Sequence, residues 1–327
     1  LIGDESLSKR PMSRVVNPLT AMGKEISTNS GKAPIQIKGG NIKDNFEYVM
    51  PIASAQVKSS LMLASMSSGN SIKITEPKVT RDHTERMIEY LDGLIETSES
   101  PQGKTIFLKN SKLSKISSYE VVGDFSSAAF IIVAALISKN SKVLIKNVGL
   151  NKTRSGLLDI LLKMNADIEI TNERMTCNEA CGDILVKSSE LVGIEVPKKI
   201  IPNIIDEIPI LSVAASFAEG KTVIKNASEL KVKESDRLNA TSMGLKAMNI
   251  KHDLLDDGLI INGSHDDIHI HKQIESFGDH RIAMSFLIAG LRSKNGSIIK
   301  DCSNIETSFP NFSIIMNNLG MNINEQD

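Results

Sequence analysis

The stretch SSAAFIIVAALISKNSKVLIKN, residues 126–147, is the most informative for the fold, because it joins a helix of small apolar residues to a short strand built on Ile, Val and Lys. Asn140 separates the two, and Asn or Gly suits the left-handed backbone that ends a helix. The pattern recurs as SSLMLASMSSGNSIKIT (59–75), IPILSVAASFAEGKTVIKN (208–226) and RIAMSFLIAGLRSKNGSIIKD (281–301). The turn residues Gly69, Asn140, Gly220 and Gly296 are 71, 80 and 76 positions apart, so the chain is predicted to repeat one structural unit.

A second helix is predicted after the strand of each unit, which then reads β-α-β-α-β-β. Most of these helices end in two apolar residues three positions apart, followed by Asn or Gly: Leu161/Met164/Asn165, Leu245/Met248/Asn249 and Met316/Leu319/Gly320. The stretch VVNPLTAMG, residues 15–23, is a further second helix with no first helix before it. The chain is therefore expected to begin in the middle of a unit.

The two kinds of helix differ in their expected burial. The first helices, at 56–66, 127–138, 209–218 and 282–292, are apolar over most of their surface, which is typical of helices at the centre of a domain. The second helices, such as 81–94 and 237–248, are amphipathic with polar outer faces. A polar stretch at 100–120 precedes one buried helix, so we predict an α/β protein with domains at 1–122 and 123–327.

Composition narrows the classes of partner. With 38 basic and 39 acidic residues the formal net charge is −1, which gives no reason to expect a nucleic-acid or membrane partner. No apolar run approaches the roughly 20 residues that span a bilayer. Cys177, Cys181 and Cys302 are odd in number and form no CxxC pair, so we expect reduced thiols in a cytoplasmic protein.

Polar residues stand at or just before the start of each buried helix. They are Ser54-Ala55-Gln56, Gly123-Asp124-Phe125-Ser126-Ser127, Asp206-Glu207 and Gly278-Asp279-His280-Arg281. Helix N-termini offer unpaired N–H donors and the positive end of the helix dipole, so converging helix starts would attract anions. Ordinary capping is an alternative explanation for Ser126 and Ser127. Arg281 beside His280 and Asp279 favours a functional role.

The densest polar cluster is KVKESDR, residues 231–237, which is expected to lie between a strand and a helix start. Capping and surface charge explain part of it, but not the crowding of Lys233, Glu234 and Arg237. Lys and Arg are suited to binding phosphate and carboxylate groups, and a Lys beside a carboxylate can transfer protons. Arg10 adds another cation before a helix.

These motifs identify the chain as a member of the 5-enolpyruvylshikimate-3-phosphate synthase family of enolpyruvyl transferases. KESDRL (233–238) and GDHRIAM (278–284) together are highly specific, while ASAQVKS (53–59) and TRDHTE (80–85) resemble the bacterial class II variants. The other matching motifs are GDESLSKRPM, PKVTRDHTERM, GDFSSAAF, IDEIPILSVAA and TSFPNF. The resemblance implies an α/β fold with two inside-out barrel domains of β-α-β-α-β-β units around buried central helices, facing each other across a cleft.

The resemblance also implies the chemistry, which is transfer of the enolpyruvyl group from phosphoenolpyruvate to the 5-hydroxyl of shikimate 3-phosphate, with release of phosphate and no cofactor. The expected phosphoenolpyruvate-binding residues are Arg10, Gln56, Lys233, Arg237 and Arg281. The expected shikimate 3-phosphate-binding residues are Ser54, Ala55, Gln56, Arg81, Asp206 and Lys233, with Thr80 and His280 as further candidates. Asp206, Lys233 and Glu234 would share the proton transfers through a tetrahedral intermediate.

Several features depart from the family pattern. Intact members carry an N-terminal Lys-Ser pair followed by Arg and a later Gly-Asn-Ala-Gly-Thr-type loop, and neither occurs here. The front of the first domain, with the position that governs glyphosate sensitivity, is therefore expected to be absent, and a monomer that needs a complementing N-terminal segment is expected. Glu229 and Thr307 stand where some members have Asn and Lys. Two alternatives stay open: an inactive fragment or half of a split synthase, and a UDP-amino-sugar enolpyruvyl transferase.

Two other features have no place in this scheme. His265, His269 and His271 alternate along one stretch, as metal ligands on one strand face would. The family needs no metal, so none is expected. Lys58 follows Gln56 by two positions, which leaves both a role in the cleft and a structural role open.

Overall fold

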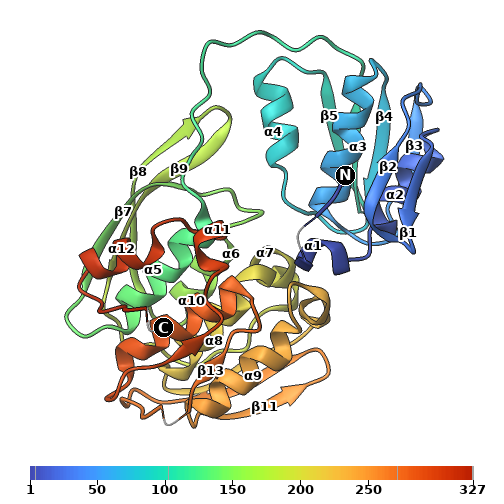
Figure 1. Ribbon diagram of the computed structural model, residues 1–327. Coiled ribbons are helices and arrows are strands. Elements are labelled where there is room, and N and C mark those ends of the chain that lie inside the picture. The colour runs from blue at the N-terminus through green and yellow to red at the C-terminus, as the bar shows by residue number, and fades with distance from the viewer. Residues whose placement is uncertain (4, 102, 271, 326–327) are drawn as a thin grey trace. The chain divides into compact units, whose positions relative to one another are not determined.

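The computed structural model describes residues 1–3, 5–101, 103–270 and 272–325 (Figure 1). The chain divides into two compact units. The first contains Leu1–Val121 with Cys177–Glu179, and the second contains Val122–Thr176 with Ala180–Asp327. Each unit has its own cluster of buried apolar residues. The grouping of Cys177–Glu179 with the first unit has no counterpart in the sequence pattern.

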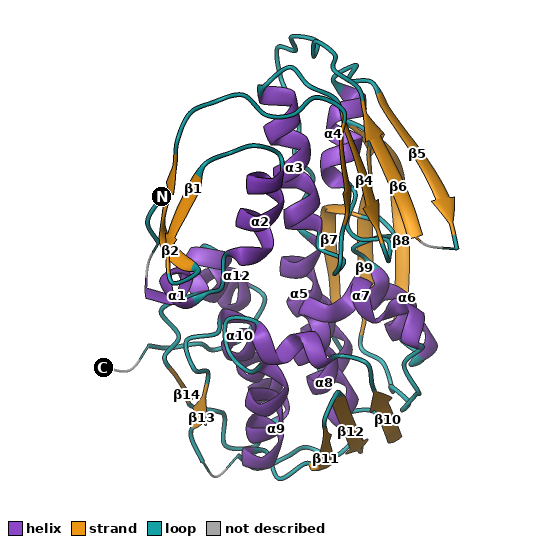
Figure 2. Cartoon of the chain, turned by 90° about the vertical axis from the view of Figure 1, so that its right-hand side faces the viewer, coloured by secondary structure: helices purple, strands orange, loops and turns teal. Residues whose placement is uncertain are grey.

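One complete copy of the β-α-β-α-β-β pattern builds most of the first unit. Its elements are β3 (Phe46–Val49), α3 (Ala55–Ser67), β4 (Ile72–Glu76), α4 (His83–Tyr90), β5 (Ile95–Ser100) and β6 (Gly103–Leu108). The strands lie in the order β3-β4-β6-β5, with β3 parallel to β4 and the other pairs antiparallel. Figure 2 shows α3 and α4 beside one face of this sheet. The preceding elements are α1 (Glu5–Lys9), α2 (Ser13–Ala21), β1 (Ile26–Asn29) and β2 (Lys32–Ile37).

The second unit repeats this pattern. One copy contains α5 (Phe125–Ile137), β7 (Lys142–Gly149), α6 (Gly156–Lys163), β8 (Asp167–Thr176) and β9 (Glu179–Lys187). The next contains η1 (Lys198–Ile200), α7 (Ile201–Ile204), η2 (Ile205–Glu207), α8 (Ile208–Ser216), β10 (Gly220–Ile224), η3 (Ser228–Val232), α9 (Arg237–Ala247), β11 (Lys251–Leu255) and β12 (Gly258–Gly263). The last contains β13 (Ile274–Glu275), α10 (His280–Ala289), η4 (Gly290–Arg292), β14 (Ile299–Lys300), α11 (Ile305–Ser308) and α12 (Phe312–Asn318).

The strand orders carry the repeat into three dimensions. In the second unit the orders β7-β9-β8 and β10-β12-β11 correspond to β4-β6-β5 of the first. Parallel bridges from Gly123 to Val148 and from Glu195 to Val223 take the place that β3 has beside β4. Each copy therefore places a helix start after a parallel strand, and this geometry positions the polar residues described below.

The core of the second unit is made by α5, α8 and α10, which pack against one another (Figure 2). All residues of α8 are buried, as are most of α5 and α10, so the predicted central helices are confirmed there. In the first unit α3 buries only one face and leaves Leu63 exposed, because α2 and β4 are its main packing partners. Within the described residues, no helix combines the length and apolar character needed to cross a membrane.

The predicted turn residues adopt the left-handed backbone. The φ angles of Gly69, Asn140, Gly220 and Gly296 are 67°, 56°, 93° and 71°. The residues that end the second helices do the same, with 70° at Asn165, 57° at Asn249 and 100° at Gly320. A positive φ is strained for most residues and readily adopted by Gly and Asn. The helix ends are therefore encoded locally, residue by residue.

Candidate active site

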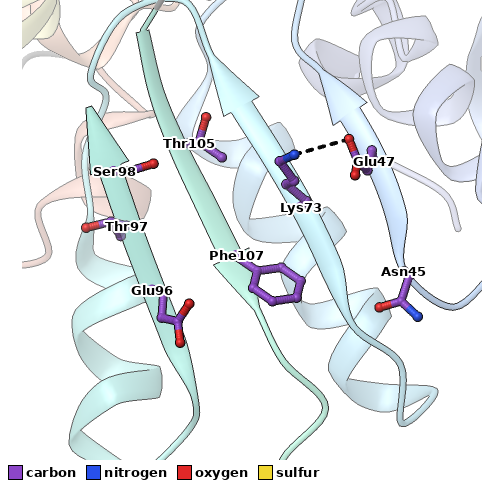
Figure 3. Close-up of a pocket in the computed structure, with 8 residues that line it drawn as sticks. All are labelled: Asn45, Glu47, Lys73, Glu96, Thr97, Ser98, Thr105 and Phe107. Atoms are coloured by element: carbon purple, nitrogen blue, oxygen red, sulfur yellow. Dashed lines mark hydrogen bonds and ion pairs between the residues drawn. The ribbon is translucent and has the colours of Figure 1, made fainter. Parts of the chain in front are cut away.

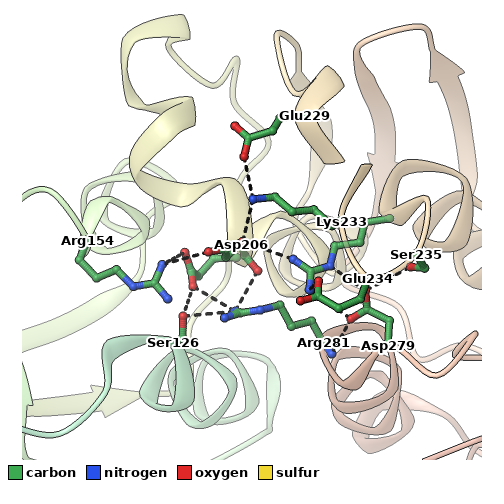
Figure 4. Close-up of polar contacts among 11 residues, drawn as sticks. Ser126, Arg154, Asp206, Glu229, Lys233, Glu234, Ser235, Asp279 and Arg281 are labelled. Atoms are coloured by element: carbon green, nitrogen blue, oxygen red, sulfur yellow. Dashed lines mark hydrogen bonds and ion pairs between the residues drawn. The ribbon is translucent and has the colours of Figure 1, made fainter. Parts of the chain in front are cut away.

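Charged side chains from several segments of the second unit meet at the starts of its buried helices (Figure 4). Apolar helices pack side by side in this core, so the charged residues of α5, α8 and α10 are confined to the helix ends. The cluster comprises Ser126, Arg154, Asp206, Glu207, Glu229, Lys233, Glu234, Ser235, Arg237, Asp279 and Arg281.

Arg237 occupies the centre of this cluster. Its Nε donates to Asp279 Oδ2 at 2.7 Å and its Nη1 donates to Asp206 Oδ1 at 3.3 Å, while Nη2 contacts Glu234. Its side chain is 1% exposed. Burial lowers the pKa of Arg237, but the charges of Asp279 and Glu234, followed by Asp206, outweigh it and raise the pKa above its ordinary value. Arg237 is therefore a permanent buried cation.

Asp206 is shared between cations. Besides Arg237, Lys233 places its Nζ 3.6 Å from Asp206 Oδ1, and Arg154 Nη1 lies 3.9 Å from Asp206 Oδ2. Lys233 Nζ also donates to Glu229 Oε1 at 2.7 Å, an i,i+4 pair with an exposed partner. Asp206, Lys233, Glu234 and Arg237, which the sequence predicts as site residues, are thus brought into one network.

Arg281 joins the same cluster from the start of α10. Its Nη1 donates to Ser126 Oγ at 3.2 Å, to the backbone oxygen of Asp206 at 3.1 Å and to Glu207 Oε1 at 3.3 Å. Asp279 caps this helix by accepting from the Arg281 backbone N–H at 2.9 Å. Since Asp279 also binds Arg237, one carboxylate links the starts of α9 and α10.

His280 lies beside Arg281 and is half-buried. Burial, followed by the positive charge of Arg281, lowers the pKa of His280 below its ordinary 6.5. Its imidazole is therefore neutral at neutral pH, and it adds no positive charge to the cluster.

The predicted site residues of the first unit lie at two helix starts. Ser54 caps α3, where its Oγ accepts from the Val57 N–H at 3.4 Å and contacts Gln56 Oε1 at 3.3 Å, with Ala55 between them. Arg81 lies in the loop between β4 and α4. Ser54, Ala55 and Gln56 thus form the start of α3, and their role in substrate binding stays a prediction. Arg10 is half-buried and directly follows α1.

Thr80, next to Arg81, is held by its neighbours. Its Oγ1 donates to Glu76 Oε2 at 2.6 Å, and its backbone N–H donates to Glu76 Oε1 at 3.3 Å. Glu76 in turn pairs with Lys58 at 3.2 Å, and Lys58 pairs with Glu85 at 2.6 Å. Lys58 is fully buried, so the structure assigns it a structural role rather than one in an open cleft.

Sequence reasoning missed Arg154 and the pairing role of Glu207. A signal for Arg154 was available in the repeats, because Thr80-Arg81 and Thr153-Arg154 both stand just before a second helix, α4 or α6. Arg237 stands at the start of the second helix α9. An Arg at this place therefore recurs in three copies, and comparing the copies would have identified Arg154.

Two other parts of the structure, a surface hollow and a histidine-rich segment, lack the features of a site. A hollow of about 510 Å³ lies on the face of the first unit's sheet that points away from α3 and α4 (Figure 3). It contains none of the predicted site residues and is crossed by the exposed Lys73–Glu47 pair.

Among the described residues no group of three potential metal ligands converges, and His265 Nε2 donates to the Leu191 oxygen at 2.8 Å. His271 lies outside the described residues.

Comparison with known proteins places these motifs. Residues 1–316 match the family described as EPSP synthase (3-phosphoshikimate 1-carboxyvinyltransferase). Proteins named 3-phosphoshikimate 1-carboxyvinyltransferase from Legionella pneumophila strain Lens and Thermoanaerobacter sp. strain X514 are each 45% identical to it, over 325 and 320 residues. The alignments cover 99% and 95% of this chain and 73% and 72% of those proteins.

A solved structure agrees. The EPSP synthase from Acinetobacter baumannii superposes with a TM-score of 0.87 at 42% identity, covering 99% of this chain and 74% of that one. These similarities do not favour a UDP-amino-sugar transferase, one of the alternatives that the sequence left open.

Proposed function

The chain belongs to the EPSP synthase family, and from this premise we propose that the charged cluster of its second unit handles phosphoenolpyruvate and the protons of the family's reaction. That reaction transfers the enolpyruvyl group of phosphoenolpyruvate to the 5-hydroxyl of shikimate 3-phosphate and releases phosphate. The observation that carries the proposal is the sharing of Asp206 by Lys233 and Arg237, because it joins a carboxylate to two cations at one place.

We assign phosphoenolpyruvate to Arg237, Arg281 and Lys233, with Arg10 and Gln56 from the first unit. Arginine binds carboxylate and phosphate groups with two parallel hydrogen bonds, which suits this substrate. Arg237 is already in contact with carboxylates, of which Glu234 is the most exposed at 28% of its side chain. An anion bound at Arg237 would replace Glu234, and the displaced carboxyl group would become available for proton transfer.

We assign shikimate 3-phosphate to Ser54, Ala55, Gln56 and Arg81, with Asp206 and Lys233. The start of α3 supports this, since free N–H groups and the helix dipole attract a phosphate there. Thr80 and His280 are weaker candidates. The Thr80 hydroxyl is already donated to Glu76, so we propose that it holds the Arg81 loop in place instead of touching substrate.

The proton steps follow from the proposed roles. Asp206 would accept the proton of the 5-hydroxyl group of shikimate 3-phosphate while the oxygen of that hydroxyl group bonds to C2 of phosphoenolpyruvate. Lys233 or Glu234 would protonate C3, which gives a tetrahedral intermediate with a methyl group. The deprotonated Lys233 or Glu234 then takes back one methyl proton as phosphate leaves C2, which regenerates the vinyl group. Positioned acids and bases of this kind contribute about 10²- to 10⁴-fold to the rate.

We propose two inside-out barrel domains with repeated units, which the corresponding strand orders β4-β6-β5, β7-β9-β8 and β10-β12-β11 support. We also propose a monomer that needs no metal. The net charge of −1 supports the further proposal that it has no nucleic-acid or membrane partner.

The test is release of phosphate from phosphoenolpyruvate in the presence of shikimate 3-phosphate, with a UDP-amino sugar as the competing acceptor. We expect turnover with shikimate 3-phosphate as acceptor and none with the UDP-amino sugar. We also expect Asp206→Asn to lower kcat at least about 10²-fold. Calorimetry of shikimate 3-phosphate binding is the second measurement. Absence of both turnover and binding would rule out the catalytic assignment for this chain.

A further inference from the structure

One half of the Arg281 guanidinium is fully engaged while the other half is not. Nη1 donates to Ser126 Oγ, the Asp206 backbone oxygen and Glu207 Oε1, at 3.1 to 3.3 Å. In the part of the chain that the structure describes, Nε and Nη2 of Arg281 have no hydrogen-bond partner, and 15% of the side chain is exposed. The paired edge that arginine uses to bind a carboxylate or phosphate is therefore open.

Glu207 is the residue that connects this arginine to the core. Its carboxylate is 1% exposed, and it binds Arg281 at 3.3 Å, Arg154 at 3.1 Å and the Ser126 hydroxyl. A carboxylate with so little exposure is stable only when charges and hydrogen bonds surround it. Arg154 supplies the second positive charge, and Ser126 supplies an O–H donor.

The repeat explains why Arg154 is there. It stands before α6, where Arg81 stands before α4 in the first unit, yet its side chain faces Glu207 and Asp206. Its side chain is 10% exposed. This copy of the recurrent arginine therefore pairs with carboxylates of its own unit.

We propose that Glu207, together with Arg154 and Ser126, is a positioning group that fixes the plane of the Arg281 guanidinium and leaves its Nε–Nη2 edge for the anionic substrate. The inference rests on the proposed function, because it concerns how the same site holds phosphoenolpyruvate. A two-bond contact needs the guanidinium plane set in advance, and a fixed plane lowers the entropy lost on binding. Glu207 acts through Arg281 and does not touch substrate.

The main test uses Ser126→Ala, because removal of this hydroxyl takes away the Arg281 contact and the Glu207 contact without burying an unpaired charge. Ser127→Ala is the matched control, since among the described residues Ser127 Oγ donates only to the helix cap Asp124, at 3.0 Å. We expect Ser126→Ala to raise KM for phosphoenolpyruvate about tenfold, the size of one lost hydrogen bond to a charged group. KM for shikimate 3-phosphate and kcat should stay within about twofold, and Ser127→Ala should match the unchanged protein.

Glu207→Gln is the stronger variant, for which we expect KM for phosphoenolpyruvate to rise about 100-fold. Circular dichroism confirms that it folds, and if it does not, Ser126→Ala and the milder Arg154→Lys decide the matter. A variant that merely unfolds a fraction of the molecules lowers kcat and leaves KM unchanged, so the split between the two constants separates positioning from stability.

Calorimetric titration with phosphoenolpyruvate gives the same comparison without turnover. If the unchanged protein turns over substrate, and Ser126→Ala and Glu207→Gln have the same KM for phosphoenolpyruvate as the unchanged protein, the inference is overturned. The proposed function would stay intact in that case. An unchanged protein that shows no turnover would overturn the function. In that case weaker phosphoenolpyruvate binding by Ser126→Ala than by Ser127→Ala would still support the positioning role, and equal or absent binding would overturn it too.

Discussion

At the scale of single residues, Lys233 shows how a sequence motif acquires a chemical environment. Its ammonium group lies between Asp206, a buried carboxylate at the start of a buried helix, and Glu229, an exposed carboxylate on the preceding turn. Lys231, two positions earlier, is exposed. The motif KVKESDR thus contains two lysines, of which Lys233 belongs to the network and Lys231 does not.

This pair of lysines gives a direct prediction. Lys233→Met should lower kcat by about 10²- to 10⁴-fold, because the proposed proton-transfer partner of Asp206 is lost. Lys231→Met should retain the kcat of the unchanged protein within about twofold. Steady-state phosphate release measures both variants. Equal losses in the two would mean that the charge of the segment matters and the contact with Asp206 does not.

At the scale of elements, buried ions tie helices and strands together in both units. In the first unit Lys58 of α3 pairs with Glu76 at the end of β4 and with Glu85 of α4, so one ammonium group joins three elements. The helix pattern alone would assign an apolar residue to this place. Breaking a buried ion group by removing one partner is more costly than losing an exposed pair.

Lys58→Met should therefore lower the free energy of unfolding of the first unit by about 3–5 kcal/mol, because two buried carboxylates lose their cation. Lys73→Met is the control in the same sheet, since the Lys73–Glu47 pair is 45% and 69% exposed. It should cost less than about 1 kcal/mol. Urea unfolding measures both, and similar midpoints for the two variants would contradict the structural role given to Lys58.

In the second unit, Asp267 joins the ends of two helical segments. It accepts from Lys139 Nζ at 2.8 Å, just beyond α5, and from Arg292 Nε at 2.6 Å, at the end of η4. These hydrogen bonds, that of Lys139 first, lower the pKa of Asp267 from 3.8 to about 2. Arg292 also donates to the Ile137 oxygen at 3.0 Å, so the C-terminal end of α5 is covered by a cation.

A pH dependence follows from the lowered pKa. The stabilisation by Asp267 should be fully present above about pH 4 and should be lost as pH falls toward 2, because the unfolded state binds the proton more tightly. Asp267→Asn should lower the free energy of unfolding by about 1–2 kcal/mol at pH 7, a value reduced for partial exposure to solvent. Asp266→Asn is the matched control. A difference between the variants that persists unchanged at pH 2 would contradict this account.

At the scale of the whole molecule, the two units have separate cores, and one spectroscopic probe reports on the first unit alone. The chain has no Trp, and its tyrosines, Tyr48, Tyr90 and Tyr119, all belong to the first unit. Tyrosine fluorescence therefore reports on the first unit, while far-ultraviolet circular dichroism reports on both. In the second unit α9 and α10 pack closely at Gly244, where an added Cβ would lie 2.0 Å from Phe286 Cζ.

We expect Gly244→Ala to lower the midpoint of the circular dichroism transition, because overpacking costs about 1–3 kcal/mol, and to leave the tyrosine midpoint unchanged. Lys58→Met should instead lower the tyrosine midpoint. Urea titrations followed by both probes make the comparison, with Gly39→Ala, where an added Cβ meets no atom within 4 Å, as the control. Identical shifts in both probes for each variant would show that the molecule unfolds as one unit.

Much of the fold was predictable because its signals are local. Apolar runs mark the buried helices, and Gly69, Asn140, Gly220 and Gly296 mark where they end, since the left-handed backbone depends on the residue itself. The family motifs are also short local stretches, and they predicted the candidate residues Asp206, Lys233, Glu234, Arg237 and Arg281. The one-sided burial of α3 was not predictable, because it depends on which elements cover the helix.

The amino-acid sequence was sufficient to predict the repeat, the helix ends, the family and therefore the reaction. The partners of each charge became visible in the folded molecule: Arg237 is enclosed by carboxylates, Arg281 keeps one edge open, and Glu207 binds Arg154. The physical reason is that a charge acts over a few ångströms of space. Residues 154, 207 and 281 are far apart in the chain and become neighbours only when three separate copies of the repeated unit pack together.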